Sequence, residues 1–385
     1  MRCATAGVLL AAALLGTRTE AALAVDVLRS VGGLPPHIVG LFEEPLGFQQ
    51  TPGGLHYVFD RRGHTVYVVD ADEKAARKLV EIGPELGRII QPRGFDVSAT
   101  GSFVVADAPR NVQRVQMFGA DGTRLGGFTL PGRQRIAALT FGPLVINGIA
   151  SIRYAGMNLL ISHPESGALF TEHSPSGFAV RSIGRLRDTG HEQDRDLHLA
   201  LNVGFPVVDP TGGFYYVFVG GRPMFRKYDS SGRLLFARHV EGIELDDYLA
   251  SLPTTWPTRK VADRELPLVT PAVRAAAVDQ IGQLWISLGQ PYTYVYDAGG
   301  DKVRTVQFSA AGIVSPTSLF FTRNGRLLIT PGYYEFDPRE EGSARAGTAP
   351  QPAHRWAAAD LLCRGDAGPW PPAPHAGTSR SGSVL

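Results

Sequence analysis

Cysteine is almost missing from this chain of 385 residues, which contains only Cys3 and Cys363. Small secreted domains without a large core are usually held together by several disulfides. Two cysteines cannot build such a framework, so that class of protein is excluded. With 44% hydrophobic residues, the chain has enough apolar material for a large core of its own.

Charge of one sign and the common catalytic motifs are also missing. The 38 Lys and Arg residues nearly balance the 36 Asp and Glu residues, and the formal net charge is +2. The basic residues are scattered rather than clustered with aromatic residues, which argues against a nucleic-acid partner. No Gly-x-Ser-x-Gly elbow, phosphate-binding P-loop or dinucleotide-binding glycine motif occurs in a suitable setting.

Long apolar runs are confined to the N-terminus, where residues 1–24 are typical of a secretory signal peptide. Arg2 precedes the short apolar run 6–16, and Ala22-Leu23-Ala24 offers a small-x-small cleavage pattern. The run is too short to span a bilayer, whose apolar part is roughly 30 Å thick. We therefore expect a secreted or periplasmic protein of bacterial type, without a membrane span. A buried N-terminal helix is the alternative interpretation.

What the chain does contain is a short pattern that recurs six times, a glycine followed by a run rich in β-branched and aromatic residues. The copies begin at Gly54, Gly101, Gly156, Gly213, Gly282 and Gly325. Such runs are typical of β-strands, and a glycine with positive φ suits the tight turn that leads into each strand. Further short apolar runs precede and follow most copies, which predicts four strands for each unit.

Four-stranded units repeated every few tens of residues are typical of β-propeller blades. We expect an all-β fold over residues 25–338, a six-bladed β-propeller of four-stranded antiparallel blades. A single blade exposes both faces of its sheet, whereas stacking blades in a ring buries them. The expected blades cover 45–82, 93–131, 145–187, 201–242, 273–309 and 314–338. A seven-bladed ring and a β-sandwich are the rival architectures.

The last unit lacks a fourth strand. Residues 25–34 resemble the fourth-strand segments of the other units, so we expect this N-terminal strand to complete the last blade and close the ring. Closure removes two sheet edges that would otherwise favour aggregation. Residues 244–271 form a long connection with a short helix expected near its start. Residues 339–385 are rich in Pro, Ala, Gly and Ser and are expected to be a disordered tail.

The second unit, QPRGFDVSATGSFVVADAPRNVQRVQMFGADGTRLGGF, resembles an NHL-type repeat. The matching positions are Pro92, Gly94, Val97, Gly101, Val105, Asp107, Arg114, Val115, Phe118, Asp121 and Gly122. In that family an Asp and an Arg commonly pair and tie adjacent strands, which implies a structural role for Asp107 and Arg114. The family includes protein- and RNA-binding modules, an amidating lyase and carbohydrate-associated proteins, so the resemblance implies no particular chemistry.

A weaker resemblance links two segments to regucalcin-like gluconolactonases. The segments EEPLGF (43–48) and INGIASIRYAGMNLLIS (146–162) are similar to the Glu-Gly-Pro and Pro-Asn-Gly segments of that family, in which the Glu and the Asn bind a divalent cation. The resemblance implies Glu44 and Asn147 as ligands of Ca, Zn or Mg, with Asn202 a further candidate at the same channel mouth. The family's Pro is replaced by Ile146, and its Asp ligand and general base have no counterpart. The other interpretation makes Glu44 a rim carboxylate and Asn147 part of a turn.

Histidine spacing does not support a zinc site, because no His-x-His or His-x-x-x-His pair occurs and no expected innermost strand contains a histidine. Tyrosines are frequent in the last three units instead. Because Tyr gives a large contact area at a small entropic cost, some of them are candidate ligand contacts. These are Tyr292, Tyr294, Tyr333 and Tyr334.

The leading hypothesis is an exported, non-catalytic propeller that binds a peptide, a glycan or a partner protein at one face of the ring, with no catalytic residue and no cofactor. The alternative is a metal-dependent lactonase or similar hydrolase with its site at the mouth of the central channel. A purely structural or assembly role is a third class. Convergence of Glu44, Asn147 and a third carboxylate would favour the enzyme.

Overall fold

The computed structural model describes residues 25–130, 139–141, 144–146, 149, 151–261 and 264–339. The predicted signal peptide, the tail from residue 340 onward and Asn147 lie outside these residues, so the predictions made for them are not tested. Within the described ranges, no helix is long and apolar enough to cross a membrane.

Four sheets contain four antiparallel strands each, in the order of the chain. The first two are β2 (Pro45–Gln50), β3 (His56–Asp60), β4 (Thr65–Val69) and β5 (Ala76–Lys78), followed by β6 (Gly94–Val97), β7 (Phe103–Asp107), β8 (Arg114–Phe118) and β9 (Arg124–Thr129). The next two are β12 (Ser151–Ala155), β13 (Asn158–Ser162), β14 (Ala168–His173) and β15 (Ala179–Arg185), followed by β16 (Gly204–Val208), β17 (Phe214–Phe218), β18 (Met224–Tyr228) and β19 (Leu234–His239).

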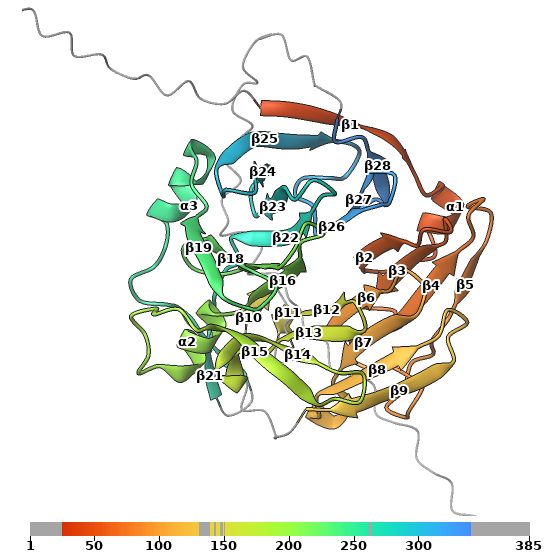
Figure 1. The fold of residues 1–385 in the computed structure, drawn as a ribbon, viewed down its shortest axis with the longest axis horizontal. Helices are drawn as coiled ribbons and strands as arrows, with labels where there is room; N and C mark the ends of the chain where they lie inside the picture. The colour runs from red at the N-terminus through yellow and green to blue at the C-terminus, as the bar shows by residue number, and fades with distance from the viewer. Residues whose placement is uncertain are drawn as a thin grey trace, which may run out of the picture. The chain divides into compact units, whose positions relative to one another are not determined.

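The remaining large sheet has eight strands in the order β22-β23-β24-β25-β1-β28-β27-β26. They are β22 (Val273–Val278), β23 (Leu284–Leu288), β24 (Thr293–Tyr296), β25 (Lys302–Ser309), β1 (Val25–Gly33), β28 (Tyr334–Phe336), β27 (Leu327–Thr330) and β26 (Ser318–Phe321). The N-terminal strand β1 therefore lies between two groups of strands that come from the C-terminal part of the chain (Figure 1).

The first strands of the successive units form a closed ring. Strand β2 contacts β6 and β26, β12 contacts β6 and β16, and β22 contacts β16 and β26. The sheets extend outward from these strands and follow one another around a common centre (Figure 1). Radial antiparallel sheets around a centre are the arrangement of a β-propeller. The structure therefore has an all-β, propeller-like fold.

Strand β1 pairs with the last unit, as the sequence predicts, but this is only part of its role. Residues 30–33 pair antiparallel with β28, whereas residues 25–29 pair in parallel with β25, and the register shifts between the two halves. Because β28 has only three residues, the nine-residue β1 is too long for it and continues along the outer edge of β25. The expectation that this strand belongs to the last blade alone is corrected.

All six repeat glycines have positive φ, between 63° and 87°. The requirement is clearest at Gly213, where an added Cβ atom would lie 2.1 Å from the carbonyl oxygen of Tyr228. The backbone of the turn before β17 therefore approaches the next strand too closely for any side chain.

Neighbouring sheets are packed together by apolar clusters that contain aromatic pairs. The ring pairs that join one sheet to the next are Phe59–Phe95, Phe170–Tyr216, Phe225–Tyr296 and Phe48–Tyr333. Trp285 and Phe321 form a ring pair between the two halves of the eight-stranded sheet. Aliphatic residues, among them Val104 and Ile152, join the sheets of β7 and β12. These clusters bury the faces of neighbouring sheets against each other, as the repetition in the sequence predicts.

Short elements fill the connections between the sheets. The helices are α1 (Pro36–Val39), α2 (Arg195–Leu201), α3 (Asp246–Ala250) and the 3-10 turns η1 (Pro109–Asn111), η2 (Pro164–Ser166) and η3 (Ile243–Leu245). Two further hairpins are β10 (Leu139–Phe141) with β11 (Leu144–Ile146), and β20 (Thr258–Val261) with β21 (Arg264–Pro267). The third unit therefore starts at Ser151 rather than at residue 145, because β11 pairs with β10 instead.

The pair inferred from the NHL-type pattern is present. Asp107 and Arg114 are cross-strand neighbours on β7 and β8, and the buried guanidinium binds both carboxylate oxygens at 2.8 and 2.6 Å. The same guanidinium donates to the carbonyl oxygens of Pro84, Glu85 and Arg88. Arg114 thus fixes the connection between β5 and β6, which confirms its structural role.

Candidate functional site

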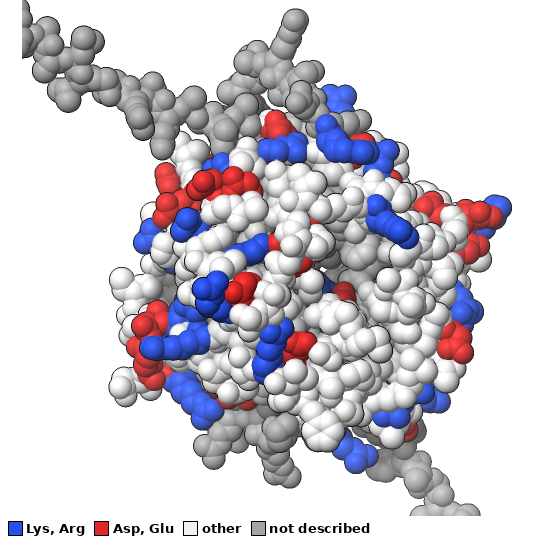
Figure 2. Space-filling view, in the orientation of Figure 1, with Lys and Arg blue, Asp and Glu red and all other residues white. Residues whose placement is uncertain are grey.

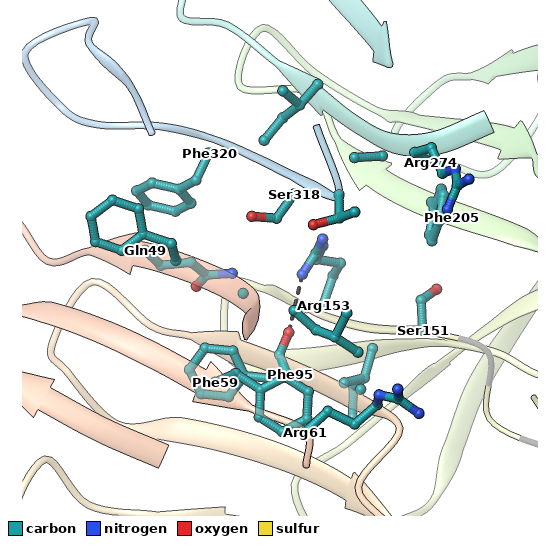
Figure 3. A pocket seen from close by; sticks show the side chains of 18 of the residues that line it. Gln49, Phe59, Arg61, Phe95, Ser151, Arg153, Phe205, Arg274, Ser318 and Phe320 are labelled. Atoms are coloured by element: carbon teal, nitrogen blue, oxygen red, sulfur yellow. Dashed lines mark hydrogen bonds between the residues drawn. The ribbon is translucent and has the colours of Figure 1, made fainter. Parts of the chain in front are cut away.

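The first strands converge on a cavity of about 270 Å³ (Figure 3). Each of the six strands β2, β6, β12, β16, β22 and β26 contributes residues to its wall. Because these strands form the closed ring described above, the cavity is the central space of the propeller. Propeller ligands commonly bind where the innermost strands converge, so this cavity is the candidate site.

Small residues on the first strands leave room for the cavity. Gly47, Gly94, Ala275 and Ala276 all line it. At Gly94 an added Cβ atom would lie 2.9 Å from Cγ2 of Ile152 on the neighbouring strand β12. Glycine at this position therefore lets two first strands approach each other closely.

One part of the wall is aromatic. The rings of Phe59 and Phe95 are stacked, with centroids 5.2 Å apart and an interplanar angle of 11°. Phe205 and Phe320 also line the cavity, and in Figure 3 Phe205 lies on the side opposite the stacked pair. The cavity therefore offers apolar ring faces on more than one side.

Arg153 is the central polar residue of the cavity. It is carried by β12, and Figure 3 shows its guanidinium between Ser318 and Phe95. Its Nη1 atom donates to the carbonyl oxygen of Phe95 at 3.1 Å and to Oδ1 of Asp96 at 3.3 Å. The other guanidinium nitrogens, Nε and Nη2, have no hydrogen-bond acceptor among the described residues.

Asp96 holds Arg153 in place from behind the wall. Its carboxylate accepts hydrogen bonds from Nε2 of Gln49 at 2.9 Å and from the backbone N–H of Tyr154 at 2.7 Å. Burial raises the pKa of Asp96, while the charge of Arg153 and these hydrogen bonds act in the opposite direction. The network determines the orientation of the guanidinium before any ligand arrives.

Three more arginines line the cavity. Arg61 forms an ion pair with Glu44. Burial and the nearby charge of Arg61 lower the pKa of Arg93. Arg274, on β22, is exposed, and its guanidinium has no ion-pair or hydrogen-bond partner within the described part of the chain. Among the described residues of the wall there are thus four arginines and one carboxylate, that of Glu44.

This positive charge is local. Figure 2 shows basic and acidic side chains interspersed over one face of the molecule, without a large area of one sign. The cavity therefore differs in its charge from the face shown in Figure 2.

Of the three residues proposed as metal ligands, the structure describes Glu44 and Asn202, and these two do not lie together. Glu44 lines the cavity, but its carboxylate is engaged by Arg61. Asn202 is fully buried at the end of α2, where its amide accepts from the N–H of Arg187 at 2.7 Å and donates to the carbonyl oxygens of Arg187 and His198. It does not line the cavity. Among the described residues, no group of three or more His, Cys, Asp or Glu side chains could hold a metal ion.

The four candidate tyrosines are also spread over different clusters, and none lines the cavity. Tyr294 is buried and its hydroxyl donates to Glu244, while Tyr292 packs against the same apolar cluster. Tyr333 is buried between Phe42 and Phe48. Tyr334 packs near Phe336 and donates to the carbonyl oxygen of Ala311 at 3.1 Å. Their role in ligand binding remains a prediction.

The hydroxyl groups of the cavity are engaged in structural hydrogen bonds. Ser151 donates to the carbonyl oxygen of Gly204 at 3.2 Å, and Ser318 shares a hydrogen bond of 2.7 Å with Thr330. No histidine is among the lining residues. The described wall therefore contains no pair of nucleophile and base, and it combines the hydrogen-bond donors of arginine with apolar surface.

Sequence reasoning missed the arginines and phenylalanines of this wall. One pattern could have indicated two of them. Arg153 in SIRYA and Arg274 in VRAAAV are charged residues inside otherwise apolar first strands. Lys and Arg are rarely placed on a buried strand without a partner or a role. Phe59 and Arg61 follow from no such pattern, because Phe59 lies in the second strand of its unit and Arg61 directly follows that strand.

No protein family model matches the chain, and no curated protein sequence matches it. Solved structures with a similar arrangement include a streptogramin B lyase, at 11% identity over 76% of this chain and 92% of that one, with a TM-score of 0.44. Virginiamycin B lyase from Staphylococcus aureus (10% identity, 74% and 77% coverage) and the hydrazine synthase of Kuenenia stuttgartiensis (13%, 75% and 92%) have the same TM-score of 0.44. These similarities are too low to transfer an activity, and the propeller-like fold follows from the strand order and the ring of first strands.

Proposed function

We propose that this protein is an exported, non-catalytic β-propeller that binds part of a peptide, glycan or partner protein in its central cavity. The observation that carries the proposal is the cavity wall itself. All six first strands contribute to it, it combines arginines with aromatic rings, and its described residues include no nucleophile–base pair. A volume of about 270 Å³ lies just below the usual range for ligand pockets, so it suits one ring-sized group of a larger ligand.

We propose further that the ring has six blades and is related to NHL-type propellers. The eight-stranded sheet then counts as two blades, β22–β25 and β26–β28, which share β1 as their outer strand. The ring of six first strands supports this count. The buried pair of Asp107 and Arg114 supports the NHL-type relation.

A cavity-filling variant tests ligand binding. Ser318→Phe should fill part of the cavity, whereas Ser176→Phe places the same side chain on an exposed turn, and each loses one hydroxyl hydrogen bond. Hits from peptide and glycan arrays should be measured by calorimetry with wild type and both variants. We expect Ser318→Phe to weaken binding about tenfold or more, since it occludes the site, and Ser176→Phe to leave it unchanged.

Two results would contradict the proposal. If wild type and a folded Ser318→Phe variant bind the ligand with equal affinity, the ligand does not bind in the central cavity. Turnover of lactones or esters by wild type with added Ca²⁺, Zn²⁺ or Mg²⁺ would favour the metal-dependent alternative.

Export is tested separately by expression in a bacterial host. We expect the periplasmic fraction to contain a mature chain that begins at Val25, identified by mass spectrometry. An intact N-terminus in the cytoplasmic fraction would argue against export without affecting the proposed binding site.

A further inference from the structure

We infer that the ligand group bound in the central cavity is a carboxylate attached to a ring-sized apolar group, held by Arg153 and Arg274 against the phenylalanine wall. This inference rests on the proposed function and names the chemistry of its ligand. A free aromatic acid and the C-terminal residue of a peptide with an apolar side chain both have this chemistry.

The first argument is the charge of the wall. In the described part of the wall, four arginines (Arg61, Arg93, Arg153 and Arg274) accompany a single carboxylate, Glu44, which is paired with Arg61. Asp96 lies behind the wall and contacts one amino group of Arg153. Among the described lining residues, Arg153 and Arg274 have no carboxylate on the wall opposite them, so an anion entering the cavity would meet a favourable potential.

The second argument is that Arg153 and Arg274 have hydrogen-bond donors without acceptors among the described residues. Arg153 uses Nη1 for its structural contacts and has Nε and Nη2 without acceptors among the described residues. This edge of a guanidinium is the one that binds a carboxylate through two parallel hydrogen bonds. Arg274 extends from another first strand on the side of Phe205 and has no described partner (Figure 3).

The third argument is pre-organisation. Arg153 is only 30% exposed, and the carboxylate of Asp96 with its 12% exposure fixes it from one side. Long side chains lose rotamer entropy when they bind a ligand. The two hydrogen bonds of Nη1 already restrict the rotamers of Arg153, so its free edge can bind an anion at a lower entropic cost than a surface arginine.

The fourth argument concerns the rest of the ligand. Phe59, Phe95, Phe205 and Phe320 line the same space as the arginines. Inorganic anions would leave these rings in contact with water, whereas an apolar ring next to the carboxylate would cover them. The wall thus favours an organic acid with an aromatic or bulky aliphatic group over phosphate or sulfate.

The test compares acids with their amides. N-acetylphenylalanine, its primary amide, phenylacetate and a hexapeptide ending in Phe, with a free or amidated C-terminus, should be titrated against the full-length protein at low and high salt by calorimetry. We expect the free acids to bind about tenfold or more tightly than the amides, because a charge-assisted bidentate contact is lost in the amide. The difference in affinity between acids and amides should become smaller at high salt, because salt screens the charge of the carboxylate.

The same titrations distinguish the two sources of such a ligand. Tighter binding of the peptide acid than of phenylacetate would identify peptide C-termini as the ligand, and the reverse order would identify free aromatic acids.

Variants assign the contact to the two arginines. Arg153→Gln and Arg274→Gln should each weaken the binding of acids about tenfold and leave the binding of amides nearly unchanged. Arg323→Gln, at an exposed turn outside the cavity, is the matched control and should have no effect. Arg274 has no described structural contact, so this variant remains informative even where Arg153→Gln unfolds the protein.

The outcomes separate this inference from the proposed function. Acids and amides that bind equally well, with binding abolished by Ser318→Phe, would overturn the carboxylate inference and keep the cavity as the binding site. Acid binding that neither Arg274→Gln nor Arg153→Gln affects would overturn it as well. Failure of every acid to bind at millimolar concentration would also overturn it.

Discussion

His56 is a buried residue that titrates outside its usual range. It lies in β3 with 4% of its surface exposed, its ring is stacked on Phe48, and its Nε2 atom shares a hydrogen bond of 2.9 Å with Nε2 of Gln50. Burial lowers the pKa of His56 from 6.5 to about 4. The folded protein thus keeps this ring neutral at a pH where the unfolded chain binds a proton.

This difference makes folding depend on pH. The contribution of His56 to stability is complete above pH 6.5 and is lost as the pH falls from 6.5 towards 4. Between pH 7.5 and 4.5 we expect wild type to lose about 2–3 kcal/mol more than His56→Phe, which cannot bind a proton. Urea unfolding at both pH values measures the difference, with His239→Phe at an exposed position as control. Equal losses in wild type and His56→Phe would show that His56 is protonated in the folded state.

The sequence indicates the contacts of some residues and not those of others, depending on how far apart the partners lie in the chain. The pairing of Asp107 with Arg114 could be inferred because both lie in one hairpin, only seven positions apart. The contact of Arg153 with Asp96 joins positions 57 apart in two different sheets. No local pattern encodes a contact over that separation, so the orientation of Arg153 was not predicted.

At the scale of elements, β1 connects two groups of strands. Leu28 is fully buried in the cluster that contains Val306 and Phe336, and Asp26 binds Arg304 at 2.8 Å. The apolar character of β1 and its likeness to other outer strands were visible in the sequence. The parallel pairing of β1 with β25 was not visible in the sequence, because it depends on how two strands far apart in the chain are placed side by side in the fold.

Replacing Leu28 by Ala should therefore weaken the protein far more than an equivalent change nearby in the same strand. We expect a loss of about 2–5 kcal/mol of unfolding free energy for Leu28→Ala, since it leaves a cavity in the cluster. Val31→Ala is the control, because Val31 is 45% exposed. Its loss should stay within about 0.5 kcal/mol, as at other surface positions. Similar losses for the two variants, measured by denaturant unfolding, would mean that β1 does not pack as described.

At the scale of the whole molecule, each of the six repeat units packs against two neighbouring units. The clusters between sheets and the contacts between first strands continue around the ring without a break. A sheet in such a ring cannot open without exposing apolar surface on two sides. The ring is therefore expected to unfold as one cooperative unit.

Hydrogen exchange followed by mass spectrometry tests this cooperativity. The second strands of the six units, β3, β7, β13, β17, β23 and β27, should lose protection together as denaturant is added. Leu28→Ala should lower the opening free energy of all six by a similar amount. Loss confined to peptides from β25 and β28, next to β1, would show that the sheets open independently.

Local chemistry determined where strands begin and which residues they contain. The repeat glycines, the runs of β-branched and aromatic residues and the Asp–Arg hairpin pair act over a few positions, so one sequence displays them. The candidate site was decided by tertiary structure alone. Arg153 and Arg274 are 121 positions apart and belong to different sheets, and they share a cavity only because closure of the ring brings the first strands to one centre. Convergence of this kind depends on how sheets pack and on where β1 pairs, and neither is encoded in any short stretch of the chain.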